Sequence, residues 1–334
     1  MPLVNSSSKK FTDYFPVPAY LLLANCGITL TDKSVKFAQF KKTGKGIELV
    51  HFVDMPLEPG IISSGYINNT DEVKKALIYL KDLYNLRYIT ATLPEERAYV
   101  FTTEIDKVPC EDLRDAVAFT IEENAPVSLE KSIFDFDIIG KTNGPKLKVA
   151  VTVVTYKGTV LYTDVFESAG LSPISFEIES QVIARAIIPK GDTRTQLIVN
   201  LSTEKTGMYI VEDEIVHFTS TTPFGARNTN GVYTDVHDLK SELRKIFAFW
   251  NTRLDAHGIP VKKIEKILIV GDEATREDFI SEIMSDVAIE YALANVWVNA
   301  LSFEETVPNI PFKESLACAA AVGLSLPRKD NFYV

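Results

Sequence analysis

Cysteine is scarce in this chain: among 334 residues only Cys26, Cys110 and Cys318 occur, far apart from one another. An odd, widely spaced set argues against a disulfide framework and against a CxxC metal site, so we expect buried, reduced thiols. Histidine is equally sparse, with four residues and no metal-ligand spacing among them. Neither a G-x-S-x-G motif nor a P-loop occurs, which disfavours a serine hydrolase and a P-loop nucleotidase.

Long apolar runs and basic runs are also missing. No window approaches the roughly 20 apolar residues of a membrane helix, and the apolar stretch 316–326 is too short. The N-terminal segment has only a brief apolar run, cut by prolines, which does not fit a secretory signal. We therefore expect a cytoplasmic protein that reaches the inner face of the cell membrane through a partner. The net charge of −10 disfavours nucleic acid as that partner.

The composition that is present, 46% hydrophobic and 24% charged, is typical of a globular protein, and the length favours two domains. A pattern of strand, polar turn, strand, turn and strand occurs at 19–53 and returns at 196–219. Each set precedes an amphipathic helix, at 70–84, which Thr70 can cap, and at 237–254. Such a repetition half a chain apart predicts two lobes of one α/β design.

A segment of different character interrupts the first half. Its order of strand, helix, two strands and helix over 99–168 predicts a small α+β unit inserted in the first lobe. The predicted domains are an N-terminal tail (1–18), a first lobe (19–98 with 169–190), the inserted subdomain (99–168), a second lobe (191–326) and a C-terminal tail (327–334).

Two hairpins carry a family resemblance. The stretches GITLTDKSVKFAQF (27–40) and LIVNLSTEKTGMYIV (197–211) resemble the paired phosphate hairpins of the actin/Hsp70-like ATPases. IEENAPVSLEKSIFDFDIIG (121–140) is similar to the inserted subdomain of PilM and FtsA proteins. ESAGLSPISFEIESQVIARAI (167–187), SELRKIFAFWNTR (241–253), ILIVGDEATREDF (267–279) and SLACAAAVGLSL (315–326) are similar to PilM segments in the same order.

The order and spacing of these motifs make residues 20 to 326 similar to PilM, the cytoplasmic actin-like component of type IV pilus assembly. The resemblance implies an α/β fold, the duplicated actin-like (ribonuclease H-like) two-lobed fold with the small α+β subdomain inserted in the first lobe. It also implies a partner: in that family the inner-membrane protein PilN inserts a short N-terminal cytoplasmic peptide into a groove beside the inserted subdomain. Other pilus-assembly components and self-association are further candidates for contacts.

An actin-like nucleotide site needs donors around the phosphates, carboxylates that hold Mg²⁺ through water, and a loop for adenosine. Hydroxyls and lysines of the two hairpins suit the phosphates, although such residues populate any exposed turn. Glu242 and Lys245 match the positions that flank adenine, although an ordinary surface pair is the alternative. The candidate nucleotide-binding residues are Thr29, Thr31, Asp32, Lys33, Ser34, Asn200, Ser202, Thr203, Lys205, Glu242, Lys245, Gly271 and Asp272.

The carboxylates of that site are missing. The family pattern is Asp-x-Gly at the end of each leading strand, and Thr29-Leu30-Thr31 and Asn200-Leu201-Ser202 stand there instead. Neutral side chains cannot neutralise a divalent cation, and the added Cβ atoms hinder a close approach of phosphate. We therefore expect a protein that is not an enzyme and requires no cofactor. ATP would serve, if bound, only as a conformational ligand.

The peptide groove is predicted only by region, between the inserted subdomain and the sheet of the first lobe. An extended peptide there would be held by backbone pairing and side-chain pockets. The candidate lining is Val100, Phe101, Ile105, Val117, Ile121 and Phe136, with plain core packing as the alternative for each. A scaffold or adaptor of a type IV pilus or a related secretion machine is the expected function. The alternatives are a nucleotide-binding actin-like ATPase and an FtsA-like division protein, although the latter would carry a C-terminal amphipathic membrane helix.

Overall fold

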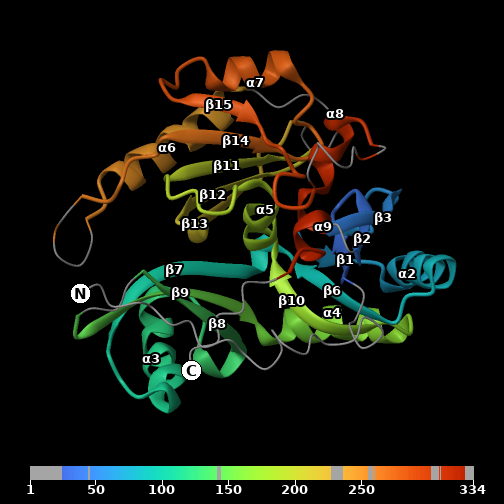
Figure 1. Ribbon diagram of the computed structural model, residues 1–334, viewed down its shortest axis with the longest axis horizontal. Coiled ribbons are helices and arrows are strands. Elements are labelled where there is room, and N and C mark those ends of the chain that lie inside the picture. The colour runs from blue at the N-terminus through green and yellow to red at the C-terminus, as the bar shows by residue number, and fades with distance from the viewer. Residues whose placement is uncertain are drawn as a thin grey trace, which may run out of the picture.

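The computed structural model describes residues 25–43, 46–140, 144–226, 236–254, 258, 260–301, 308 and 310–327. Its elements form two five-stranded sheets, a three-stranded sheet and a small β-ribbon, with helices between and around them (Figure 1). The predicted tails, apart from Pro327, lie outside the described residues, as do the start of the first predicted strand and His257. The predicted domain boundaries stay predictions.

The first sheet has the strand order β10-β6-β1-β2-β3. Strands β1, β2 and β3 form an antiparallel meander, and β6 and β10 join β1 in parallel. Helix α2 covers one face with the buried side chains of Val73, Leu77 and Leu80. The strands are β1 (Asn25–Leu30), β2 (Ser34–Thr43), β3 (Gly46–Pro56), β6 (Tyr88–Leu93) and β10 (Ser172–Ile178), and the helix is α2 (Thr70–Tyr84). The ribbon consists of β4 (Ile62–Ser63) and β5 (Tyr66–Ile67).

The ends of α2 are set by asparagines. Asn69 is the N-cap, and its side chain accepts a hydrogen bond from the amide of Glu72 at 3.2 Å. Asn85 ends the helix in the left-handed conformation, with φ of 52°. The expectation that Thr70 caps this helix is therefore wrong by one residue, because the extended backbone that a cap needs occurs at Asn69.

The second sheet repeats the first. Its order, β13-β12-β11-β14-β15, again combines an antiparallel meander with two parallel strands, which agrees with the predicted duplication. Helices α6 and α7 cover its outer face (Figure 1). The elements are β11 (Gln196–Leu201), β12 (Thr206–Glu212), β13 (Ile215–Thr222), α6 (Val236–Asn251), β14 (Lys266–Val270), α7 (Glu277–Met284) and β15 (Glu290–Leu293).

The inserted subdomain is a three-stranded antiparallel sheet, β7-β9-β8, packed on one helix. Its elements are β7 (Ala98–Asp106), α3 (Leu113–Asn124), β8 (Ser132–Ile139) and β9 (Lys146–Thr155), with 3-10 turns at Glu95–Arg97, Cys110–Asp112 and Leu129–Lys131. The next helix, α4 (Tyr156–Ser168), packs Tyr162, Val165 and Phe166 into the core of the first lobe. The subdomain thus has its own small core and is joined to the first lobe through α4.

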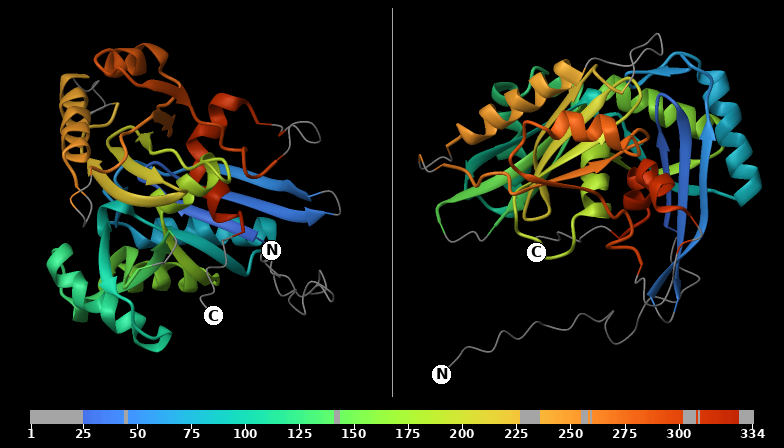
Figure 2. Two further views of the ribbon diagram at one scale, coloured as in Figure 1. Left: turned by 60° about the vertical axis from the view of Figure 1, so that its left-hand side comes forward. Right: turned by 90° about the horizontal axis from the view of Figure 1, so that it is seen from above.

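Two short helices lie between the large sheets: α5 (Glu179–Ile187) and α9 (Ala319–Leu324), which follows α8 (Phe312–Ser315) and the 3-10 turn Leu316–Cys318 (Figures 1 and 2). They cross in direct backbone contact, since a Cβ on Gly323 would lie 1.8 Å from the carbonyl oxygen of Val182. Ser325 donates to the carbonyl of Ala38 in β2 at 2.8 Å, which ties this end of α9 to the first sheet. These helices therefore join the two lobes in one core.

Two of the three thiols are buried as expected. Burial raises the pKa of Cys26 to about 11 and that of Cys318 to about 12, so both stay protonated at neutral pH. Cys110 is exposed, which corrects the expectation for that residue: it lies in a turn that precedes α3. Within the described ranges, no helix combines the length and hydrophobicity needed to span a membrane.

Candidate functional site

The two predicted phosphate hairpins meet across a cleft between the lobes. The turn after β1 and the turn after β11 line one cavity of about 640 Å³ together with the loop after β14. The lining includes Thr31, Asp32 and Lys33 of the first hairpin, Ser202, Thr203 and Lys205 of the second, and Asp272 of the loop. The structure thus brings together seven of the candidate nucleotide-binding residues from distant parts of the sequence. This is expected where the ends of corresponding strands in two halves of a duplicated fold face each other.

The hairpin donors are already used within their own turns. The amide of Thr31 donates to the carbonyl of Ser34 at 2.9 Å, and the hydroxyl of Thr31 accepts from the Ser34 amide at 3.0 Å. In the second hairpin the amide of Ser202 donates to the carbonyl of Lys205 at 3.0 Å. Ser34 itself is buried. These turns therefore offer few free backbone donors for a phosphate.

The two residues that replace the expected acids do not line the cavity. Thr29 is buried, and its hydroxyl shares a hydrogen bond of 2.6 Å with Thr92 in β6. Asn200 is buried as well, and its side-chain amide donates to Glu179 at 3.2 Å. Both side chains are satisfied by neighbouring protein groups, so neither is directed at a ligand in the cleft.

Lys36 is a residue beside this cleft that the sequence analysis missed. It lies opposite Thr29 in the β1–β2 register, its side chain is only 2% exposed, and its ammonium contacts Asp54 at 2.9 Å and Asp272 at 2.7 Å. Burial alone would lower its pKa, but the carboxylate of Asp272 and its other neighbours outweigh burial and raise it. Alternation places a lysine between Val35 and Phe37 on the polar face of its strand, so no local signal indicated that Lys36 is buried. Because Asp272 belongs to the second lobe, Lys36 joins the lobes.

Lys205 makes the second connection across the cleft. Its ammonium forms an ion pair with Glu96 and lies 3.6 Å from Asp32 of the first hairpin. Asp32 also accepts from the amides of Ser64 at 3.2 Å and Gly65 at 3.4 Å. The candidate residues Asp32, Lys205 and Asp272 are thus paired with protein charges. A phosphate could reach Lys36 or Lys205 only by displacing a carboxylate, whereas the third lysine, Lys33, is exposed in the cavity lining.

Acidic side chains gather behind Lys205. Glu95, Glu96 and Glu179 surround a closed gap beside Asn200. Burial raises the pKa of Glu95 to about 7 and also raises that of Glu179. Among the described residues, no group of acids, histidines and cysteines has the arrangement of a metal site. An excess of carboxylates disfavours a triphosphate in this part of the cleft.

Gly271 is required by its surroundings. Its φ is 109°, and a Cβ there would lie 2.3 Å from the carbonyl oxygen of Leu201. The following residues continue the contact between loop and hairpin, because Glu273 donates its amide to Leu201 at 3.1 Å and its carboxylate accepts from Thr203 at 3.2 Å. The loop that the resemblance assigned to adenosine is therefore packed against the second hairpin.

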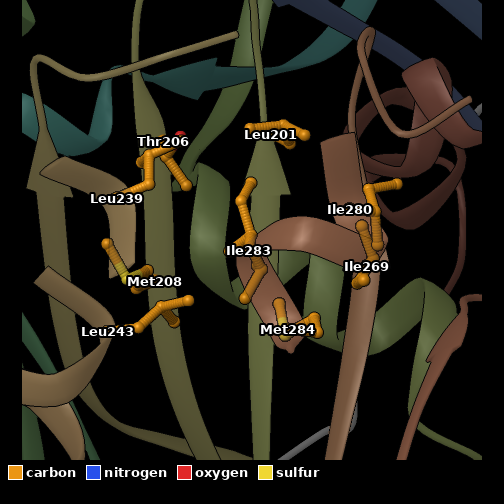
Figure 3. A pocket seen from close by; sticks show the side chains of 10 residues that line it. Leu201, Thr206, Met208, Leu239, Leu243, Ile269, Ile280, Ile283 and Met284 are labelled. Carbon is orange, nitrogen blue, oxygen red and sulfur yellow. The ribbon is translucent and has the colours of Figure 1, made fainter. Parts of the chain in front are cut away.

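Glu242 and Lys245 lie elsewhere. They form an ion pair of 2.6 Å with each other on α6, and neither lines the cleft. The arrangement is that of a surface pair three residues apart, which was the alternative interpretation. Figure 3 shows a different gap, inside the second lobe, lined by apolar side chains such as Leu243, Met208 and Ile283. Its volume of about 10 Å³ makes it part of the core.

A second open cavity, of about 450 Å³, lies between the inserted subdomain and the first lobe. One wall is β8 with Arg114 of α3, and the other is formed by β10 and Gln181 of α5. We call it the subdomain groove. Its lining is Leu93, Arg114, Ile133, Phe134, Asp135, Phe136, Asp137, Thr152, Val154, Thr159, Phe176, Glu177, Ile178 and Gln181.

Of the six candidates for a peptide groove, Phe136 lines the subdomain groove. Ile105, Val117 and Ile121 are buried in the core of the inserted subdomain, and Phe101 packs against that core. Val100 packs against the core between the lobes. The alternation of β8 could have indicated Phe134, which shares a strand face with Phe136 and also lines the groove. Phe176 and Glu177 of β10 become neighbours only through the tertiary fold.

Comparison with known proteins supports this architecture. A family model described as "Type IV pilus assembly protein PilM" matches residues 27–247. A solved structure described as a "PilM-PilN type IV pilus biogenesis complex" matches with a TM-score of 0.74 and 16% identity, covering 90% of this chain and 97% of that chain. No curated protein sequence matches this chain.

More distant structures have TM-scores below 0.5. The ethanolamine utilization protein EutJ from Carboxydothermus hydrogenoformans matches with a TM-score of 0.48 and 11% identity, over 93% of this chain and 90% of that chain. A protein of Bacteroides thetaiotaomicron with an actin-like ATPase fold and unknown function matches with 0.47 and 10% identity, over 80% and 90% of the two chains.

Proposed function

Because this chain belongs to the family of type IV pilus assembly proteins PilM, we propose that it is a cytoplasmic scaffold that binds the N-terminal segment of a PilN-like inner-membrane protein and does not hydrolyse ATP. The observation that carries the proposal is the subdomain groove, an open channel of about 450 Å³ between two strands at sheet edges. The similar solved structure is described as a complex of PilM with PilN. A short peptide is the ligand that such a channel suits, and it would recruit the protein to the membrane.

The cleft between the lobes supports the second half of the proposal. Lys205 in its lining and Lys36 beside it are paired with carboxylates of the protein itself. The positions of the two expected acids hold Thr29 and Asn200. Hydrolysis in an actin-like site depends on a metal ion held near the phosphates. The charge arrangement of this cleft thus favours a permanently paired interface between the lobes over a nucleotide site.

The peptide half is tested by calorimetry with a synthetic peptide of the N-terminal cytoplasmic segment of the PilN-like protein from the same organism. We expect Phe136→Ala to weaken binding by at least about tenfold, because an aromatic side chain in the lining is a typical hot spot. Ile133→Ala, at an exposed position of the same groove, should also weaken binding without disturbing the core. Phe119→Ala is the matched control, since Phe119 is 82% exposed and lies outside the groove.

Equal binding by all three variants, with unchanged circular dichroism, would move the peptide site away from the subdomain groove. No binding to the unmodified protein would remove the PilN-like partner from the proposal.

The nucleotide half is tested by titration with Mg-ATP and by a phosphate-release assay. We expect no heat of binding at micromolar protein and no phosphate release above background. The rival function, an actin-like ATPase, predicts micromolar affinity and measurable turnover. Either result in the purified full chain would contradict our proposal.

A further inference from the structure

Glu95 lies where the inserted subdomain is joined to the rest of the molecule. It opens the 3-10 turn Glu95–Arg97, and β7, the first strand of the subdomain, begins directly after this turn at Ala98. Both the turn and β7 pack against β13 of the second lobe (Figure 1). The contact of this turn with β13 therefore holds the entry of the inserted subdomain against the second lobe.

The carboxyl group of Glu95 is buried at that contact. Its Oε2 atom accepts from the amide of Ser180 in α5 at 2.9 Å, and among the described residues its Oε1 atom has no hydrogen-bond partner. The hydroxyl of Thr221 in β13, which lines the same closed gap, is buried without a partner among these residues as well. The gap has no room for a water molecule that could serve both groups. An ionised carboxylate is poorly solvated here, so the contact favours the protonated form.

The charges around Glu95 also oppose its ionisation. The gap is lined by Glu96 of the same turn, Glu179 of α5 and Lys205 of the second hairpin. The ammonium of Lys205 is already held by Glu96 and lies 3.6 Å from Asp32. One cation thus faces several carboxylates, and burial raises the pKa of Glu95 to about 7 and raises that of Glu179 as well. A further negative charge in this gap repels the carboxylates already present.

The other titratable groups on the elements around Glu95 do not offset this charge. Tyr209 of β12 lines the gap, and burial raises its pKa, so its phenol stays neutral. The guanidinium of Arg97 lies over the ring of Tyr66 in β5 and is outside the lining of the gap. The titratable residue of β13 is His217, whose ring lies against α6. As the pH rises, Glu95 thus ionises without a new cation to balance it.

We propose that Glu95 is a pH-sensitive switch: its protonated form holds the entry of the inserted subdomain against the second lobe, and its ionised form releases it. In the released state the turn and β7 move away from β13, and water solvates the carboxylate. The first lobe keeps its hold on the subdomain through α4, whose Tyr162, Val165 and Phe166 lie in the core of that lobe. The inserted subdomain therefore moves without unfolding, and the switch does not depend on the partner proposed above.

The pH range of the switch follows from the two states of Glu95. In the released state the carboxyl ionises near its ordinary pKa of 4.5, whereas in the held state it ionises near a pKa of about 7. Below pH 4.5 both states are protonated, and above about pH 7 both are ionised, so the ratio of released to held molecules is constant in each of these ranges. Between them only the released state ionises, and the ratio rises by about tenfold per pH unit.

The experiment is hydrogen exchange of the full chain, followed at the amide of Ser180. This amide lies in the first turn of α5, where the helix offers no acceptor, so its hydrogen bond to Glu95 reports the held state. We expect its protection factor, which corrects for the exchange rate of a free amide, to fall on the order of a hundredfold from pH 5 to pH 8. In Glu95→Gln, which keeps an acceptor and cannot ionise, protection should be constant. Asp164→Asn, at an exposed aspartate of α4, is the matched control and should keep the full pH dependence.

The amides of β11, the central strand of the second sheet, report unfolding of the whole chain. They should stay better protected than Ser180 at every pH. Equal protection of Ser180 and β11 would show that the contact opens only when the chain unfolds, and this would overturn the proposal. Constant protection of Ser180 in the original chain, or equal pH dependence in Glu95→Gln, would overturn it too. If Glu179→Gln alone removed the pH dependence, the titrating group would be Glu179 and the assignment of Glu95 would be wrong.

Discussion

Glu95, in the closed gap behind Lys205, is a buried carboxyl group with one unsatisfied oxygen. It follows β6, is 4% exposed, and accepts a hydrogen bond from the amide of Ser180 at 2.9 Å through one carboxylate oxygen. Its other oxygen is buried without a hydrogen-bond partner. Burial, with the nearby charge of Glu179 as a smaller contribution, raises its pKa from 4.5 to about 7. A proton on this carboxyl thus stabilises the fold.

The raised pKa predicts a stability that falls as pH rises. Below pH 4.5 Glu95 is protonated in both the folded and the unfolded chain, so it contributes no pH dependence. Between pH 4.5 and about 7 only the unfolded chain ionises, and the folded chain loses on the order of 3 kcal/mol. We expect Glu95→Gln to be more stable than the original chain at pH 8, with the gain disappearing near pH 4.5. Urea unfolding at several pH values measures this.

The control for that measurement is Glu111→Gln, at an exposed position. It should leave the slope of stability against pH unchanged. An identical slope for Glu95→Gln and the original chain would show that Glu95 ionises in the folded protein as it does in water.

Gly271→Ala tests the close approach between the loop after β14 and the second hairpin. The new Cβ would lie 2.3 Å from the carbonyl of Leu201, at a φ of 109°. We expect a loss of about 2–4 kcal/mol in the free energy of unfolding, because the clash adds to backbone strain of about 1–2 kcal/mol. Gly140→Ala is the control, with a φ of 72° and open space around its Cβ, and should cost only the strain. Equal losses would show that the loop moves away without cost.

At the scale of elements, the meander that opens each lobe was predictable and the partners of its side chains were not. Alternating side chains and polar turns indicated the hairpins of β1–β2 and β11–β12. The sequence also indicated that Thr29 and Asn200 replace acids. The pairing of Lys36 with Asp272 could not be predicted, because it joins residues 236 positions apart in different lobes. Local patterns specify strands, but the contacts between lobes depend on how the sheets are packed.

Lys36→Met tests the link between β2 and the second lobe. Removing the ammonium leaves Asp272 largely buried without its cation, which typically costs about 3–5 kcal/mol. We expect a loss of this order in chemical unfolding, and faster hydrogen exchange in the loop after β14. Lys75→Met is the matched control, because the Lys75–Glu72 pair on α2 lies in solvent, and its stability should hardly change. Unchanged exchange in Lys36→Met would mean that the lobes stay together without this ion pair.

At the scale of the whole molecule, the duplicated plan and the insertion followed from order and spacing along the sequence. Both sheets contain the predicted three-strand meander, and two parallel strands complete each of them. The groove could be placed only by region, because its walls, β8 and β10, belong to different sheets whose separation no local pattern encodes. Six residues were predicted to line the groove, and four of them lie in or against the core of the inserted subdomain: Phe101, Ile105, Val117 and Ile121. The sequence pattern showed that they are apolar but not which surface they face.

The position of α9 has a consequence for biosynthesis. The first sheet receives this helix from a part of the chain far downstream: Ser325 bonds to Ala38, 287 positions earlier, and the backbone of Gly27 has no room for a Cβ beside Leu324. During translation β1 and β2 leave the ribosome early, while the helix that covers them is still unmade. The part of the first sheet that contacts α9 therefore stays uncovered until residues 319–325 have left the ribosome.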